Sequence, residues 1–148
     1  MNIAIQRVGI SLAALLAASV SLQAIASPSQ MPSERTVGVA TYISGGIGEG
    51  QADRFKAAMD RYPLAIELFE HTGALDEYTA NARVKIADHR GQTVLDERAD
   101  GPFMLVRLPA GEYRVVASLN GHELPARQVH VTGVGHERTV FVWPKNVG

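Results

Sequence analysis

The chain has 148 residues, with 14 lysines and arginines against 15 aspartates and glutamates, a formal net charge of −1 and no cysteine. This balance offers no basic footprint for nucleic acid or for an anionic membrane surface, and the lack of cysteine excludes both disulfides and a lipid-modified N-terminal cysteine. A chain of this length fits one domain whose core needs neither a metal nor a disulfide to fold.

Residues 1–26 have the parts of a secretory signal peptide. Arg7 supplies a positive charge, residues 8–20 form a run of apolar and small side chains, and Ala24-Ile25-Ala26 fits the small-x-small cleavage pattern. The run is short for a membrane span, and an uncleaved anchor is the alternative. We expect cleavage before Ser27, which leaves a periplasmic or secreted protein that neither spans the membrane nor carries a lipid.

The next segment predicts a leader, a strand and a helix. Residues 27–35 hold two prolines and three serines, which is typical of a flexible leader. Apolar and β-branched side chains then alternate over residues 36–44 and predict one strand. Residues 36–62 thus form a strand-plus-helix extension ahead of the main domain.

Residues 51–62 predict the helix of this extension. Ala52, Phe55, Met59 and Tyr62 recur at helical spacing, so this stripe is expected to cover part of a sheet. Gly50 is the expected N-cap, and Asp53 falls in the first turn, where a negative charge is favourable. Lys56 and Asp60 are expected to pair on the opposite face, and Pro63 ends the helix.

From residue 63 to 148 the apolar pattern has a period of two. Short alternating runs are separated by turns rich in Gly, Pro, Asn and Asp, and residues 71–79 read as a polar loop. The candidate strands are residues 64–68, 82–86, 93–98, 103–108, 113–119, 126–132 and 137–143. The pattern predicts a mainly β protein, an antiparallel β-sandwich of about seven or eight strands, with one N-terminal helix packed on it.

Residues 100–121 form the centre of this prediction. Two antiparallel strands are expected to meet at the turn Pro109-Ala110-Gly111, with Gly111 at positive φ, and Asn120-Gly121 predicts a second hairpin turn. Tyr113 follows the first corner. We expect its hydroxyl to bond a backbone group and lock the connection rather than to act as a general acid.

Three segments resemble one known family. Ala82-Arg-Val-Lys-Ile86, Asp100-Gly-Pro-Phe103 and Leu108-Pro-Ala-Gly-Glu-Tyr113 occur in the order found in the carboxypeptidase regulatory-like domain. The resemblance covers roughly residues 63–143. It implies a transthyretin-like sandwich with an accessory role and no peptidase activity. The preceding Ser-Gly-Gly-Ile-Gly-Glu segment resembles the lead-in of a group of secreted bacterial proteins whose function the resemblance leaves open.

The glycines Gly45, Gly46, Gly48 and Gly50 are the first candidate ligand site. They follow a predicted strand and open a predicted helix, where backbone N–H groups are able to cradle an anion. The dinucleotide-binding pattern fails because Gln51 stands where its last glycine belongs. The alternative is a flexible connector between the strand and the helix.

Five histidines raise the question of a copper or zinc site. His71, His89 and His130 are expected on loops or on the solvent side of a strand, so no metal site is predicted from them. His122 and His136 flank one predicted hairpin and are the only pair whose convergence would create a metal site.

Catalytic patterns are missing from the sequence. The second histidines that His-Glu-x-x-His zinc motifs require are replaced by Ala126 and Val140, and no Gly-x-Ser-x-Gly elbow occurs. The densest acidic groups, Asp96-Glu97 with Asp100 and Asp76-Glu77, lie at strand ends and loops and read as solvated charges. We therefore expect no enzyme and no cofactor.

Phe141 and Trp143 alternate with valines in the last predicted strand and leave two functions open. If these rings face outward they form a patch for a protein or a carbohydrate, and if they face inward they belong to the core. The expected function is a non-catalytic protein- or carbohydrate-interaction or accessory module whose unknown protein or glycan partner lies in the cell envelope. The alternative is a periplasmic protein that binds a small ligand, an anion or a metal through residues 45–50 or the histidines.

Overall fold

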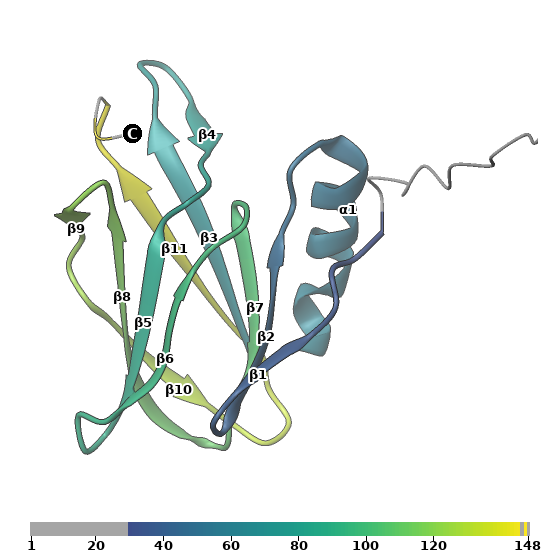
Figure 1. The fold of residues 1–148 in the computed structure, drawn as a ribbon, viewed down its shortest axis with the longest axis vertical. Helices are drawn as coiled ribbons and strands as arrows, with labels where there is room; N and C mark the ends of the chain where they lie inside the picture. The colour runs from purple at the N-terminus through teal and green to yellow at the C-terminus, as the bar shows by residue number, and fades with distance from the viewer. Residues whose placement is uncertain (1–29, 146, 148) are drawn as a thin grey trace, which may run out of the picture.

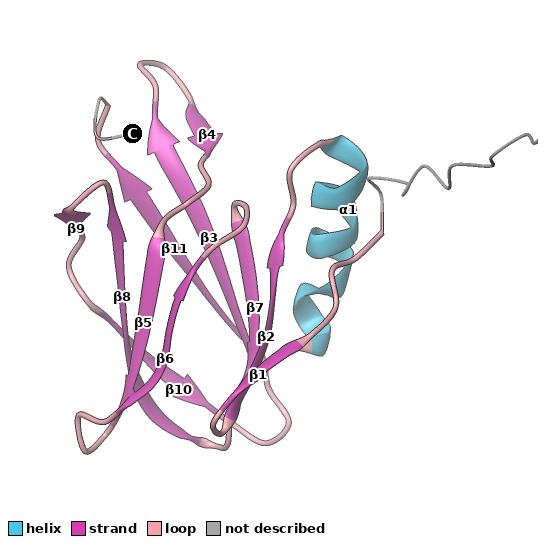
Figure 2. Cartoon of the chain, in the orientation of Figure 1, coloured by secondary structure: helices cyan, strands magenta, loops and turns pink. Residues whose placement is uncertain are grey.

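The computed structural model describes residues 30–145 and 147, which fold into two facing β-sheets with one short α-helix against an outer face (Figures 1 and 2). The prediction of a mainly β sandwich carrying one helix is therefore confirmed. The expected signal peptide lies outside the described residues. Among residues 30–145 and 147, no helix is long and apolar enough to cross a membrane.

One sheet has six strands in the order β1-β2-β7-β3-β11, with the short β4 also paired to β3. Its strands are β1 (Arg35–Val37), β2 (Ala40–Gly45), β3 (Leu64–His71), β4 (Asp76–Tyr78), β7 (Phe103–Arg107) and β11 (Glu137–Trp143). The pairing is antiparallel except between β3 and β11, which run parallel. The sandwich was expected to be antiparallel, and this parallel pair corrects that expectation. The chain passes through the second sheet between β3 and β11, and a long crossover of this kind allows two paired strands to run parallel.

The other sheet has five strands in the order β10-β8-β5-β6, with β9 paired to β8. Its strands are β5 (Arg83–Asp88), β6 (Thr93–Arg98), β8 (Gly111–Leu119), β9 (His122–Glu123) and β10 (Arg127–Val131). Buried and exposed residues alternate along β8 and β10, as expected for strands that cover a core on one face only.

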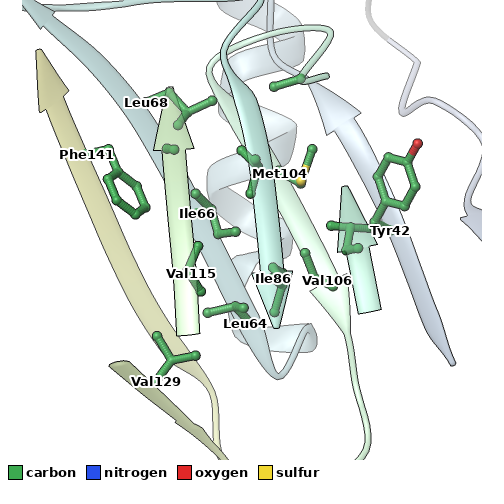
Figure 3. Close-up of a cluster of buried hydrophobic side chains, with 14 of the residues drawn as sticks. Tyr42, Leu64, Ile66, Leu68, Ile86, Met104, Val106, Val115, Val129 and Phe141 are labelled. Carbon is green, nitrogen blue, oxygen red and sulfur yellow. The ribbon is translucent and has the colours of Figure 1, made fainter. Parts of the chain in front are cut away.

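The main core fills the space between the two sheets. Figure 3 shows side chains from both sheets pointing toward one another, among them Ile66 and Met104 from the six-stranded sheet and Ile86 and Val115 from the five-stranded one. Phe141 and Trp143 are fully buried in this core, and the Trp143 indole Nε1–H donates to the His122 carbonyl at 2.7 Å. Phe141 and Trp143 therefore belong to the core and do not form an exposed aromatic patch.

The N-terminal extension is part of the six-stranded sheet. Residues 36–44 do not form one strand, because the chain turns at Gly38, where φ is +56°, and leaves Val39 exposed. β2 then pairs with β7. The described part of the expected leader makes specific contacts, since the Tyr62 hydroxyl donates to Glu34 Oε1 at 2.8 Å.

The N-cap of the helix and the ion pairs on its surface differ from the prediction. Helix α1 spans Glu49–Ala58 with Gly48, not Gly50, at its N-cap, and a short 3-10 turn, η1, follows over Met59–Arg61. Lys56 pairs with Asp53 at 3.5 Å, whereas Asp60 faces His136 at 3.4 Å. The 3-10 turn is the reason, because its tighter winding disrupts the i,i+4 spacing expected between Lys56 and Asp60.

The apolar face of α1 covers the outer side of the six-stranded sheet. Phe55 is fully buried there and stacks on Phe103 of β7 at a ring-centroid distance of 5.6 Å. Successive residues of β7 point to opposite faces, so Phe103 and Leu105 meet the helix while Met104 and Val106 enter the main core. β7 is therefore buried on both faces, in keeping with its nearly continuous apolar sequence.

The corner at residues 109–111 joins the two sheets. β7 and β8 belong to different sheets, so the predicted antiparallel pair across this turn is wrong, and Gly111 does not adopt a positive φ. The Tyr113 hydroxyl donates to the Pro109 carbonyl at 2.7 Å, which is the kind of bond to a backbone group that was expected of it. The second predicted turn is confirmed, because Asn120 and Gly121 have φ of 47° and 84° between the paired β8 and β9.

Candidate ligand-binding cleft

A cleft of about 680 Å³ lies between the N-terminal half of α1 and strand β4. One wall is the loop after β2 and the first turns of α1, and the other is β4, the two residues after it and Pro102. The lining residues are Gly46, Ile47, Gly48, Glu49, Ala52, Asp53, Lys56, Tyr78, Thr79, Ala80 and Pro102. Figure 1 shows β4 and the loop from β2 into α1 at the same end of the sandwich.

Close packing explains the glycines nearest to the sheet. Gly46 has a φ of +99°, and a Cβ there would lie 2.3 Å from Cδ2 of Phe103. A Cβ on Gly101 would lie 2.3 Å from the Gly45 carbonyl oxygen. Glycine is therefore required at 46 and 101 by the approach of backbone to ring and of backbone to backbone.

The loop amides at positions 46 and 47 are satisfied within the protein. The side-chain oxygen of Gln51 accepts the N–H of Gly46 at 2.7 Å and that of Ile47 at 3.3 Å. These donors would have been central to an anion cradle. The structure instead uses them to fold the loop back onto the helix, and Gly48, at a φ of +85° with open space around it, begins α1.

The opposite wall carries an exposed aromatic ring on a stack. Residues 76–78 were expected in a polar loop but form β4, which pairs Tyr78 with Phe69 of β3. The Tyr78 ring lies 4.8 Å from the Phe69 ring and 5.0 Å from the Phe103 ring, and 43% of Tyr78 remains exposed. Tyr78 is thus held as a rigid platform facing the cleft.

Three charged side chains line the same cleft. Lys56 Nζ lies 5.5 Å from the centre of the Tyr78 ring and 3.5 Å from Asp53 Oδ1. Its interaction with Tyr78, followed by that with Asp53, raises the pKa of Lys56, so the ammonium stays charged at neutral pH. Glu49 lies one helical turn before Asp53. The two carboxylates and the Lys56 ammonium together give the cleft lining a net charge of −1.

The two histidines predicted as a possible metal pair do not converge. His122 lies in β9 beside the C-terminal end of β11, whereas His136 precedes the N-terminal end of β11. β11 has seven residues, about 23 Å at about 3.3 Å per residue. In the described part of the chain, no three His, Cys, Asp or Glu side chains gather as a metal site.

The remaining candidate residues form isolated surface pairs. His71 meets Asp76 at 2.7 Å, and His130 meets Glu112 on the exposed face of the five-stranded sheet. Asp96 and Asp100 pair with Arg83 and Arg35 at 2.7 and 2.9 Å. Asp96 and Asp100 are therefore partners of surface arginines, and His89 lies exposed in a turn.

Sequence patterns pointed to one wall of the cleft and missed the other. The glycine cluster marked residues 45–50, but Lys56 was assigned to the solvent face and Tyr78 to a loop. β4 pairs with the preceding strand β3 as a hairpin, and the pairing of β3 and of β2 with the distant strand β7 places Tyr78 opposite α1. Comparison with protein-family models, with curated proteins and with solved structures finds no match to this chain.

Proposed function

We propose that the protein is a non-catalytic carbohydrate-binding module that takes an uncharged, hydroxyl-rich ligand in the cleft between α1 and β4. The observation that carries the proposal is Tyr78, which stays 43% exposed although its ring packs against both Phe69 and Phe103. Sugar rings have an apolar C–H face, and a fixed aromatic ring buries that face at little entropic cost.

The polar groups of the cleft suit ligand hydroxyls. Glu49 and Asp53 accept hydrogen bonds, Lys56 donates them, and the Thr79 hydroxyl does either. The carboxylates repel an anion while Lys56 repels a cation, so a neutral ligand is favoured over a strongly charged one. The use of the Gly46 and Ile47 amides by Gln51 also argues against a phosphate at this loop.

The placement of the carboxylates argues for binding without hydrolysis. Cleavage of a glycosidic bond ordinarily uses two carboxyl groups on either side of the scissile bond. Glu49 and Asp53 both project from successive turns of α1 on one wall, and the opposite wall, formed by residues 78–80 and Pro102, carries no acid.

The sequence supports a location and a family for this role. The expected signal peptide over residues 1–26 directs the protein to the periplasm or outside the cell. The segments at 82–86, 100–103 and 108–113 resemble the carboxypeptidase regulatory-like domain, and that resemblance implies an accessory role. We include both in the proposal: a module of the cell envelope that holds a glycan for another component.

A panel of neutral oligosaccharides, titrated into the protein and followed by NMR, tests this function. At least one is expected to shift the amide signals of residues 46–56 and 78–80 in a saturable manner. Tyr78→Ala should weaken that binding by about tenfold or more, since losing about 1.4 kcal/mol corresponds to a factor of ten.

Leu75→Ala is the matched control. Leu75 is 69% exposed on the hairpin that joins β3 to β4 but does not line the cleft, so its loss should leave the affinity unchanged. If no oligosaccharide in the panel binds, or if Tyr78→Ala binds as well as the unaltered protein, the proposed function is wrong.

A further inference from the structure

A second pocket, of about 290 Å³, opens on the five-stranded sheet and does not contribute to the cleft between α1 and β4. Its lining residues are Asn81, Arg83, Arg98, Ser118, Asn120 and Gly121. We propose that this pocket binds a tetrahedral oxyanion of the phosphate class between Arg83 and Arg98. This inference does not depend on the proposed carbohydrate site.

The sheet register places the two arginines directly opposite each other. Arg83 of β5 pairs with Arg98 of β6 on one side and with Ser118 of β8 on the other. Val84, the next residue along β5, is fully buried, so the row containing Arg83 points to solvent. Like charges directly opposite on neighbouring strands destabilise a sheet, and an anion held between them removes that repulsion.

The pocket is lined by hydrogen-bond donors and by no carboxylate. The Arg83 Nε–H donates to Asp96 Oδ1 at 2.7 Å, which orients the guanidinium and leaves its terminal N–H groups for a ligand. Among the described residues, no ion pair or side-chain hydrogen bond involves the Arg98 guanidinium, although its backbone belongs to β6. With Asp96 offsetting one charge, Arg98 and the Ser118 hydroxyl remain to meet an anion.

Two asparagines line the same pocket. Asn81 and Asn120, with φ of 67° and 47°, are the non-glycine residues of positive φ in the described chain, and both line it. The Asn81 N–H donates to the Ala99 carbonyl and the Asn120 side-chain amide to the Val147 carbonyl, each at 3.0 Å. Both asparagines therefore lie beside the arginine pair as further polar side chains of the pocket.

Two probes distinguish a free oxyanion from one carried on a larger molecule. The first is inorganic phosphate, and the second is glucose 6-phosphate, which carries a phosphoryl group on a sugar. Each is titrated at constant ionic strength against chloride, while NMR follows the Nε–Hε signals of the arginines and a thermal melt follows stability. Saturable shifts of Arg83 and Arg98 with either probe are expected. At about ten times the dissociation constant, the melting temperature should rise by roughly 5 °C.

Arg98→Gln distinguishes a site from general electrostatics. It should abolish the phosphate-dependent rise in melting temperature, while the melting temperature without phosphate stays equal or increases because the repulsion with Arg83 is relieved. Arg114→Gln removes the same charge from the same sheet outside the pocket and should keep the phosphate response. The proposal is overturned if neither probe saturates, or if Arg98→Gln responds to phosphate as the unaltered protein does.

Discussion

Replacing Gly46 with alanine tests whether packing against the sheet fixes the conformation of the glycine loop. The added Cβ would lie 2.3 Å from Cδ2 and 2.9 Å from Cε2 of Phe103. Phe103 is fully buried and cannot yield easily, because the Phe55 ring lies 5.6 Å away on one side and the Tyr78 ring 5.0 Å away on another. The clash must therefore be relieved by movement of the loop.

The expected cost has two parts. Overpacking of a buried contact costs about 1–3 kcal/mol, and a side chain at positive φ costs about 1–2 kcal/mol. Gly48→Ala is the matched control, since Gly48 also has a positive φ, +85°, but no atom lies within 4 Å of the added Cβ. Gly46→Ala should therefore lose about 2 kcal/mol more free energy of unfolding than Gly48→Ala.

Denaturation in urea measures both variants, with the midpoint reporting stability and an unchanged slope reporting an unchanged extent of unfolding. Phe103→Leu supplies the second test. If the clash with the ring is the cause, the double variant Gly46→Ala with Phe103→Leu should lose about 1 kcal/mol less than the sum of the single losses. Equal losses at positions 46 and 48, or strict additivity with Phe103→Leu, would refute the packing argument.

Two further predictions concern the corner and the N-terminal segment. Tyr113→Phe deletes the 2.7 Å bond to the Pro109 carbonyl and should cost about 1 kcal/mol, so an unchanged melting temperature would contradict the role of the hydroxyl. The bond from Tyr62 lowers the pKa of Glu34 below its ordinary value of 4.5, so the carboxylate stabilises the fold above that pH and the benefit disappears as pH falls below it. The stability difference between the unaltered protein and Glu34→Gln should therefore vanish in acid, and a difference independent of pH in urea melts would exclude this linkage.

Local chemistry determined where the strands and turns lie. Alternating side chains predicted a strand over residues 126–132, and β10 forms there with Val129 and Val131 buried. Asn120-Gly121 predicted a hairpin because these residues tolerate positive φ, and they adopt it. These features depend on a few neighbouring residues, so the sequence is sufficient to predict them.

Pairing between distant segments was decided by the tertiary structure. Pro109-Ala110-Gly111 reads as a hairpin turn, yet β7 is needed in the six-stranded sheet, where helix and core bury both of its faces, and β8 is needed in the opposite one. The parallel partnership of β3 with β11 likewise has no local signature.

Both candidate sites combine a local hairpin with distant pairings. The sequence by itself determined the glycine loop, whereas the pairing of β2 and β3 with β7 brings the β3–β4 hairpin and Tyr78 beside it. In the second site the β5–β6 hairpin sets Arg83 against Arg98, and the distant pairing of β5 with β8 adds Ser118. Turn propensity and alternation are set by each residue's own backbone and side chain. Strand partners are instead selected by the burial of apolar faces across the whole domain, and only the folded chain decides them.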